Sequence, residues 1–439
     1  MFARTLTGDP VKANCLSQLM MLLEGYHPRN FAVRLWDGTV WEAEPSDTAK
    51  FTVILKHPES LSRLFAPPCD LSLAEAYLHD DFDIDGDIEA ANTLGNYLYS
   101  LTWIAKPLRR TVWRRLAQAL LTGHDAGRKA SALPGKLHSR ERDRRAVISH
   151  YDLSNDFFPL WLDKHMVYSC AYFSSPSEDL DTAQERKLDY VCRKLRLRRG
   201  ERFLDIGCGW EGLIMHAAGH YGTKALGLTL SKRQAELANE RIERSGLGRS
   251  CRVEVCDYRE LSSHSAFHKI VSVGMYEHVG MSALSDYFEQ VWRLLAPGGV
   301  FLNHGISVRK EFKLNPFIDR YVFPDGEVVS IGSLLSAVEQ SGFEVRDVES
   351  LREHYALTLR HWLNRLEAGH DKAAQIVGEQ TYRVFRLYLS AFAARFRSGL
   401  FDVYQTLLLK SKDGESGFPL TRDDWYVRVF DGHDSSASS

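Results

Sequence analysis

The pattern of hydrophobic and polar positions is most regular between about residues 146 and 308. Short apolar runs of strand length alternate there with segments whose apolar residues recur every three to four positions, as on one face of a helix. The apolar runs lie at residues 202–206, 225–229, 252–255, 269–273 and 300–304. Helices are predicted at 212–220 and, with Ser231 as the N-terminal cap, from there to about 244. This alternation predicts a doubly wound α/β fold with a mainly parallel sheet.

The flanking regions have different patterns. Before about residue 120, alternating Phe31, Val33 and Leu35 predict a strand, and Asp37-Gly38 can turn it into a second strand at 39–41. A further strand is expected at 51–55, whereas the chain after residue 308 is more helical and aromatic. We therefore expect a smaller N-terminal α+β domain at 1–120, a basic linker at 121–145, the main α/β domain at 146–410 and a C-terminal tail at 411–439.

Composition narrows the class of protein. A formal net charge of −2 argues against a dedicated nucleic-acid-binding protein, whose binding domain is usually strongly basic. The seven cysteines are scattered and lack a CxxC metal spacing, which indicates reduced thiols in a cytoplasmic protein. The N-terminus lacks a signal-peptide layout, and no segment approaches the roughly 18 consecutive apolar residues of a membrane span. Any membrane contact is therefore expected to be peripheral.

The segment from Lys106 to Arg145 differs from the rest of the chain in charge, since it holds 12 basic residues against three acidic ones. Its glycine- and alanine-rich middle is typical of a solvated connector between domains. A second interpretation is a surface patch for anionic lipid headgroups, because each basic residue near such a surface contributes about 1 kcal/mol. The neighbouring Trp103 and Trp113 favour a membrane interface.

A glycine turn follows the first strand of the main domain. Gly207, Gly209 and Gly212 stand between a strand and a helix, where glycine lets the backbone approach a nucleotide closely. Asp205 precedes the turn, and its carboxylate suits the amino group and sulfonium of a cationic ligand. The second strand ends at Thr229 without the acidic residue that binds ribose in NAD enzymes. These features favour S-adenosylmethionine over NAD.

Three further groups of residues complete the expected cofactor site. Cys208 lies within the glycine turn, and the ribose side is assigned to Thr229, Leu230 and Gln234. Residues after the third strand are expected beside adenine, namely Asp257, Tyr258 and Arg259.

Several distinctive strings lie outside this generic pattern, at 150–157, 168–172, 272–280, 321–326 and 385–392. In composition and order, from about 148 to 410, they resemble the cyclopropane-fatty-acyl-phospholipid synthases and the related mycolic acid cyclopropane synthases. The resemblance implies a Rossmann-like class I methyltransferase sheet with helical insertions that form an acyl pocket. It also implies a homodimer, and a looser match of residues 1–120 to the N-terminal lipid- or substrate-associated domain of the family.

The resemblance further implies a reaction. Enzymes of this family transfer a methyl group from S-adenosylmethionine to a cis alkene of an unsaturated phospholipid acyl chain, and bound bicarbonate removes a proton so that a cyclopropane ring closes. The bicarbonate ligands carried over by the motifs are Cys170, Glu277, His304, the backbone of Ile306, and Tyr355. Cofactor contacts carried over are Tyr168, Ser169, Trp210 and Tyr258. Glu211 departs from the glycine that the family has at this position.

Other interpretations of these residues stay open. Without the family, Cys170 is equally a small core thiol, His304 a hydrogen-bonded buried histidine and Glu277 a helix cap; His278 is interpreted as structural. Among functions, the nearest alternative gives methyl- or methylene-branched acyl chains from the same carbocation. A non-catalytic lipid-binding relative and a methyltransferase for oxygen or nitrogen acceptors are more distant alternatives.

Three remaining signals are weaker. Residues 81–86 imitate the start of a calcium loop, but Asn92 stands where the bidentate glutamate belongs, and the segment also fits a strand. The helical stripe of Phe385, Tyr388, Phe392 and Phe396 predicts either core or the wall of an acyl tunnel. The arginines around this stripe are interpreted as a solvated face or as ligands of lipid phosphates; they are Arg383, Arg386, Arg395 and Arg397.

Overall fold

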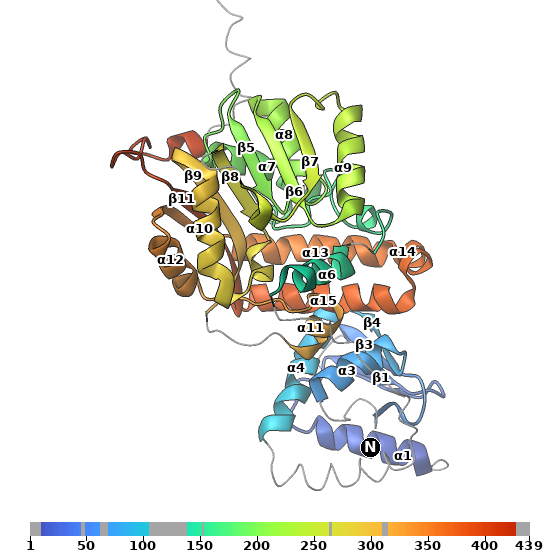
Figure 1. The fold of residues 1–439 in the computed structure, drawn as a ribbon. Coiled ribbons are helices and arrows are strands. Elements are labelled where there is room, and N and C mark those ends of the chain that lie inside the picture. The colour runs from blue at the N-terminus through green and yellow to red at the C-terminus, as the bar shows by residue number, and fades with distance from the viewer. Residues whose placement is uncertain are drawn as a thin grey trace, which may run out of the picture. The chain divides into compact units, whose positions relative to one another are not determined.

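The computed structural model describes residues 10–44, 49–61, 69–104, 138–151, 153–262, 266–309 and 315–426 (Figure 1). The chain divides into two compact units. The smaller unit comprises residues 1–132, 315–322 and 377–394, and the larger unit comprises residues 133–314, 323–376 and 395–439. Residues 105–137, which include most of the predicted basic linker at 121–145, lie outside the described residues. In the part of the chain that is described, no helix has the length and apolar character needed to cross a membrane.

The larger unit is built on a seven-stranded sheet in the order β10-β11-β9-β8-β5-β6-β7. Its parallel strands are β5 (Arg202–Ile206), β6 (Lys224–Thr229), β7 (Cys251–Val255), β8 (Phe267–Val273) and β9 (Leu295–Val308). Two antiparallel strands complete the other edge, β10 (Glu344–Ser350) and β11 (Phe401–Leu409). The α/β prediction is confirmed, and each of the five predicted strands is present.

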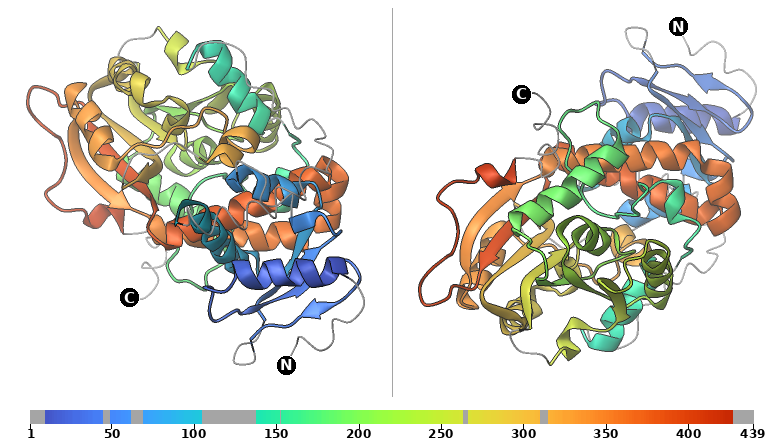
Figure 2. Two further views of the ribbon diagram at one scale, coloured as in Figure 1. Left: turned by 90° about the horizontal axis from the view of Figure 1, so that it is seen from below. Right: turned by 90° about the horizontal axis from the view of Figure 1, so that it is seen from above.

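Helices cover both faces of this sheet (Figures 1 and 2). Successive strand residues point to opposite faces, so Phe203 joins one hydrophobic cluster and Leu204 the other. The first cluster contains α7 (Leu180–Lys194), α8 (Gly212–Tyr221) and α9 (Lys232–Arg244). The second contains α10 (Leu284–Leu294) and α12 (Ile331–Gln340). Ser231 caps α9 as predicted, since its side chain accepts a hydrogen bond from the amide of Gln234.

The remaining helices of the larger unit are α6 (Arg140–Tyr151), α13 (Arg352–Ala368) and α14 (His370–Val377). The strand order reverses direction beside β5, because β6 follows on one side and β8 on the other. In open α/β sheets, ligands bind at the carboxyl ends of the strands at such a switch point. The fold therefore places the expected site where the glycine turn leaves β5.

The smaller unit contains a four-stranded sheet in the order β2-β1-β3-β4. Its strands are β1 (Phe31–Arg34), β2 (Val40–Trp41), β3 (Phe51–Leu55) and β4 (Phe82–Gly86). The predicted β1–β2 hairpin is present, and the segment that imitates a calcium loop forms β4. Its helices are α1 (Pro10–Leu22), α3 (Cys69–Leu78), α4 (Ile88–Ile104), α11 (Pro316–Tyr321) and the greater part of α15 (Glu379–Arg397).

Two arginines of α15 correct the interpretation of a solvated or lipid-binding face. Arg383 and Arg386 are buried within the smaller unit. The Arg383 guanidinium lies 2.9 Å from an Asp80 oxygen and 3.2 Å from an Asp83 oxygen, and it donates to the Tyr77 carbonyl at 2.8 Å. Arg386 donates to the Tyr77 hydroxyl at 2.9 Å. These side chains hold α15 against α3 and β4, which leaves their donors committed to the protein itself.

Candidate active site

The glycine turn after β5 is fastened to the neighbouring strand. Gly207 and Gly209 have φ angles of +83° and +55°, in the left-handed region that favours glycine. The amides of Gly207 and Cys208 donate to the Leu228 carbonyl in β6 at 3.0 and 2.9 Å. A Cβ atom at Gly227 would lie 2.6 Å from Cys208 Sγ. Glycine at 227 therefore lets the turn pack directly against β6.

One pocket of about 1220 Å³, including solvent at its mouth, lies at this edge of the sheet. All the residues predicted to bind the cofactor line it. They are Tyr168, Ser169, Asp205, Gly207, Cys208, Gly209, Trp210, Thr229, Leu230, Gln234, Asp257, Tyr258 and Arg259. The structure adds lining residues that the motifs did not indicate, among them Lys187 in α7 and Asp143 in α6. The predicted set is thus a single surface rather than scattered positions.

Asp205 and Lys187 form the electrostatic centre of the pocket. Both side chains are buried, and Lys187 Nζ donates to the Ser169 hydroxyl at 3.0 Å. Burial raises the pKa of Asp205 to about 7, although the Lys187 cation opposes this shift, and burial lowers the pKa of Lys187 to about 8. Within the described residues, Asp205 Oδ1 has no hydrogen-bond partner. A buried carboxylate oxygen without a partner is costly, so this atom is well placed to bind a cationic ligand group.

We expect Asp205→Asn to weaken S-adenosylmethionine binding about tenfold or more, because a buried charge-assisted hydrogen bond contributes about 1.5–3 kcal/mol. Wild-type affinity should fall as the pH drops below about 7, since the neutral carboxyl no longer attracts the cationic amino group. The Asn variant should lose this pH dependence. Calorimetric titration at pH 6 and pH 8 measures both effects, with exposed Asp286→Asn as the control. Equal affinities of variant and wild type would remove Asp205 from the binding surface.

The opposite side of the pocket is ordered by side-chain pairs. The Thr229 hydroxyl donates to Gln234 Oε1 at 2.7 Å, which joins the end of β6 to α9. Arg259 lies 2.7 Å from Asp257 and 3.0 Å from Asp143, so one guanidinium connects the β7 loop to α6. These pairs hold the two predicted binding segments in place before any ligand arrives.

Glu211 occupies the position where the family resemblance predicts glycine, and its backbone explains that preference. Its φ angle is +72°, a conformation that non-glycine residues rarely adopt. The side chain is fully buried, and Arg241 Nε lies 3.0 Å from its Oε1 in poor hydrogen-bond geometry. Burial raises the pKa of Glu211 to about 8 from its ordinary 4.5, while Arg241 opposes the shift. This chain therefore carries an unusual buried acid beside its glycine turn.

The raised pKa of Glu211 predicts a pH-dependent stability. The folded state keeps a proton that the unfolded state releases, so wild-type stability should fall as pH rises from about 4.5 to about 8. Glu211→Gln keeps the shape but cannot ionise. The melting temperature of the variant relative to wild type should therefore rise between pH 5 and pH 8. Thermal melting across this range measures the difference. If the melting temperatures of wild type and variant change with pH in the same way, Arg241 keeps the Glu211 carboxylate ionised.

A second group of polar residues lies where β8 and β9 end. Glu277, in the turn after β8, accepts a hydrogen bond from the Ile306 amide through Oε1 at 2.7 Å. His304 stands two residues earlier on β9, and its carbonyl accepts from the Gly274 amide at 2.8 Å. His304 is buried and Glu277 is half-buried with its Oε2 out of solvent; burial raises the pKa of Glu277 to about 7 and lowers that of His304. The structure thus joins the Glu277 side chain to the backbone of Ile306, and the backbone of His304 to the turn after β8.

Gly305 permits this close approach. A Cβ atom at 305 would lie 2.0 Å from the ring of Tyr276 and 3.1 Å from Glu277 Oε1. The Tyr276 hydroxyl donates to the Ile306 carbonyl. The backbone around Ile306 is therefore held from two sides, by Tyr276 and by Glu277.

Cys170 and Tyr355 join this group through Leu351. The Cys170 thiol lies 3.7 Å from the Leu351 carbonyl, which also accepts from the Tyr355 amide at 3.0 Å. The Leu351 amide donates to the Val403 carbonyl at 2.8 Å. Val403 is the β11 residue that lies opposite Ile306 in the β9–β11 register. Burial raises the pKa of the Cys170 thiol far above its ordinary range, so it stays protonated and is no thiolate nucleophile. The five predicted ligand residues thus lie along one short path of contacts.

Two polar atoms of this group have no hydrogen-bond partner in the described parts of the chain, namely Glu277 Oε2 and His304 Nε2. Buried polar atoms are normally paired, so these two mark a place for a polar ligand. A carboxyl group and a neutral imidazole can both donate to an oxyanion. This donor chemistry fits bicarbonate.

Aromatic rings surround Tyr168 at the border of the cofactor pocket. The ring centroids of Trp161 and Trp362 lie 5.2 Å from that of Tyr168, and Phe158 and His150 follow at 5.8 Å. Such π faces stabilise cations and exclude water.

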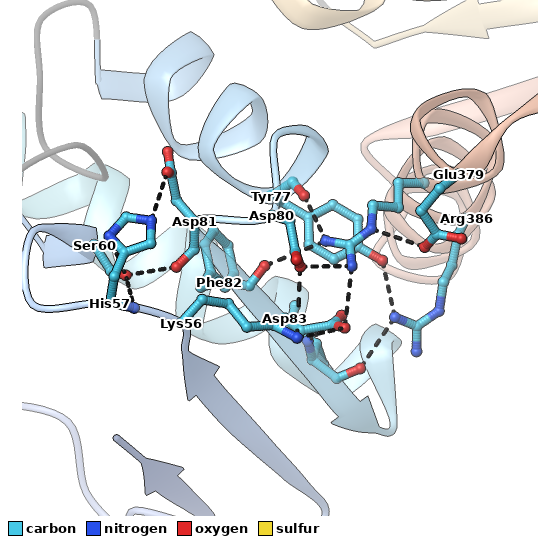
Figure 3. Close-up of polar contacts among 12 residues, drawn as sticks. Lys56, His57, Ser60, Tyr77, Asp80, Asp81, Phe82, Asp83, Glu379 and Arg386 are labelled. Carbon is cyan, nitrogen blue, oxygen red and sulfur yellow. Dashed lines mark hydrogen bonds and ion pairs between the residues drawn. The ribbon is translucent and has the colours of Figure 1, made fainter. Parts of the chain in front are cut away.

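The smaller unit holds a polar cluster that imitates a catalytic triad. His57 Nε2 lies 3.0 Å from an Asp81 carboxylate oxygen, and the Ser60 hydroxyl lies 3.5 Å from His57 Nδ1 (Figure 3). However, Ser60 is fully buried and its hydroxyl donates to the Asp81 carbonyl at 2.6 Å. Its proton is directed away from the histidine, so the cluster stabilises the fold rather than forming a nucleophile.

A seven-stranded sheet with a pocket at its switch point defines the class: the protein is an S-adenosylmethionine-dependent methyltransferase. The family model described as mycolic acid cyclopropane synthetase matches residues 138–406. The chain belongs to this family, and the predicted resemblance is confirmed. A second model, described only as a domain of unknown function, matches residues 18–94.

The most similar relatives include a probable fatty acid methyltransferase from Pseudomonas putida, which is 39% identical over 94% of this chain and 100% of its own. Cyclopropane-fatty-acyl-phospholipid synthase from Escherichia coli K12 is 37% identical over 68% of this chain and 76% of its own. Among solved structures, mycolic acid cyclopropane synthase CmaA1, complexed with SAH and CTAB, is 35% identical and has a TM-score of 0.57. That match covers 61% of this chain and 98% of CmaA1.

Proposed function

We propose that this enzyme transfers a methylene unit from S-adenosylmethionine to the cis double bond of unsaturated acyl chains in membrane phospholipids, forming cyclopropane acyl chains. The observation that carries the proposal is that Glu277 Oε2 and His304 Nε2 are both buried and lack a hydrogen-bond partner within the described residues. A methyltransferase for oxygen or nitrogen acceptors needs only a simple general base, whereas methylation of an alkene leaves a proton to remove from the transferred methyl group. The name of the Escherichia coli relative supports the same substrate class.

The alkene π electrons attack the sulfonium methyl, the carbon–sulfur bond breaks to give S-adenosylhomocysteine, and a carbocation forms on the neighbouring carbon. Loss of one proton from the transferred methyl leaves the electron pair that closes the ring. Bound bicarbonate supplies the base for this proton.

The residues of the chain hold the reactants for these steps. Asp205 and Ser169 orient the amino-acid end of the cofactor, and Tyr168 and its aromatic neighbours face the developing cation. Cys170, Glu277, His304, Tyr355 and the backbone of Ile306 hold the anion. His304 is buried, and the Oε2 atom of the half-buried Glu277 is shielded from solvent, which supports exclusion of water from the cation.

A second candidate shares the carbocation but ends differently. A 1,2-hydride shift to the cation, followed by proton loss from the transferred methyl group, would give a methylene-branched chain. Proton loss from a chain carbon instead would give a methyl-branched alkene. The Pseudomonas putida relative, named a probable fatty acid methyltransferase, matches nearly the whole chain and favours this candidate. The presence of the residues carried over as bicarbonate ligands, Cys170, Glu277, His304 and Tyr355, favours ring closure.

Mass spectrometry of lipids from cells expressing the protein tests the proposal. Monounsaturated phospholipid acyl chains should gain one CH2 unit and then resist mild hydrogenation, as a ring does. A product that takes up hydrogen would support the methylene-branched alternative. An unchanged lipid profile, together with cofactor turnover on another acceptor, would overturn both.

We further propose a homodimer on the cytoplasmic face of the membrane, attached peripherally, as access to phospholipid substrates requires. Sedimentation with liposomes that contain or lack anionic lipid tests this attachment. Binding that depends on anionic lipid supports a contribution from the basic segment.

A further inference from the structure

Gln405 is a buried polar residue in an otherwise largely apolar strand, and it faces His304. The two residues are directly opposite in the antiparallel β9–β11 register, and both are almost fully buried. Their side chains meet, with 3.3 Å between Gln405 Nε2 and His304 Nδ1. Burying an amide is costly unless it is hydrogen-bonded; here Nε2 bonds His304, while Oε1 has no partner within the described residues.

With the amide nitrogen of Gln405 toward the ring, this contact favours one of the two neutral tautomers of His304. An amide NH2 group only donates, so Nδ1 must accept, and the single proton of the neutral ring then resides on Nε2. The ring stays neutral because burial and the nearby Lys187 and Lys194 cations all disfavour a charge on it. His304 Nε2 is the buried atom that finds no hydrogen-bond partner anywhere in the described chain.

We infer that Gln405 is a positioning residue that holds His304 in the Nε2–H tautomer, so that the ring donates a hydrogen bond to the proton-accepting anion. The opposite tautomer would present a lone pair at Nε2 and could not donate to the anion. This inference rests on the proposed function, because the anion is the proposed bicarbonate. Gln405 acts through His304 and has no direct role in the reaction.

The test uses Gln405→Met, which keeps the length of the side chain but removes the donor. Binding of 13C-bicarbonate to the full-length enzyme, measured by NMR line broadening without lipid, should weaken about tenfold, as expected for one oriented hydrogen bond. Thr406→Val is the matched control. It removes a neighbouring buried hydrogen bond, from Thr406 to the Asn303 carbonyl at 3.2 Å, and should leave bicarbonate binding unchanged.

A double-mutant cycle separates positioning from a general structural role. In a His304→Gln background, Gln405→Met should cause little further loss of bicarbonate binding, because its effect passes through His304. Additive losses would overturn the inference. Circular dichroism and unchanged S-adenosylmethionine affinity verify that the variants are folded.

NMR of the unmutated enzyme gives an independent test. With 15N-labelled histidine, the His304 signal, identified by its absence in His304→Gln, should show the proton on Nε2; a proton on Nδ1 would overturn the inference. Wild-type bicarbonate binding in Gln405→Met would overturn it too, while leaving the proposed function intact. If the wild-type enzyme neither binds bicarbonate nor depends on it, the proposed base is wrong, and the inference falls with it.

Discussion

Glu277→Gln should reduce turnover by about 10²- to 10⁴-fold, the range over which positioned acid–base groups contribute to catalysis. Glutamine can still accept from the Ile306 amide through Oε1, so the local backbone should keep its arrangement. The substitution instead replaces the second carboxylate oxygen, Oε2, which is buried and has no hydrogen-bond partner within the described residues. An amide NH2 in its place can donate but never accept, so it cannot adjust its protonation to the anion.

Cofactor affinity should stay unchanged in this variant, because Glu277 is not among the residues that line the cofactor pocket. Turnover is measured as S-adenosylhomocysteine release with unsaturated phospholipid vesicles, and cofactor binding by calorimetry. Glu353→Gln, the same change at an exposed side chain on α13, is the control. Wild-type turnover in the Glu277 variant would remove this residue from the reaction.

Gly305→Ala should be nearly as damaging, through packing alone. The new methyl group would lie 2.0 Å from a ring carbon of Tyr276, closer than any real contact, so the ring must move. Overpacking of this kind costs about 1–3 kcal/mol of folding free energy. Displacing Tyr276 also breaks its hydrogen bond to the Ile306 carbonyl and shifts the backbone that binds Glu277. We therefore expect turnover to fall at least about tenfold, since small misplacements in an active site have large effects.

Gly332→Ala provides the matched comparison in α12. The nearest atom to its new Cβ is the Ser330 hydroxyl at 3.8 Å, so the methyl group fits. Alanine in a helix should raise stability by up to about 1 kcal/mol. Denaturant unfolding of both variants measures the contrast. A Gly305 variant as stable and active as wild type would show that Tyr276 has room to retreat.

The parallel strands could be predicted from the sequence because each is a short apolar run bounded by turn residues. The cofactor surface could be predicted as well, since Asp205, the glycine turn and Thr229 belong to consecutive strand ends that one sheet edge must bring together. For the second group of residues, the family motifs were needed, because Cys170 and Tyr355 reach it only through long-range contacts. Their assignment as ligands of an anion stays a prediction.

Other features had no local signal. Gln405 and His304 are about a hundred residues apart, and only the antiparallel register of β9 and β11 places them opposite each other. Lys187 is one of several charged residues in α7, and its burial follows from tertiary packing that the sequence does not show. The same holds for Arg383, whose carboxylate partners Asp80 and Asp83 precede it by some 300 residues. The charge of these side chains alone therefore suggested contact with solvent or lipid, whereas the fold supplies buried partners for them.

The arginine contacts of the smaller unit also limit how the chain can be divided. That unit takes in residues 1–132 but also residues 315–322 and 377–394, so no single cut separates it from the rest. Removing the first 132 residues would strip Arg383, Arg386 and Arg320 of Asp80, Asp83, Tyr77 and Glu75. Of the partners described for Arg383, the remaining chain would keep Glu379, 2.9 Å from its Nε, and lose the contacts to the N-terminal residues. The N-terminal residues therefore cannot be removed as an independent domain without breaking the contacts that α11 and α15 make with them.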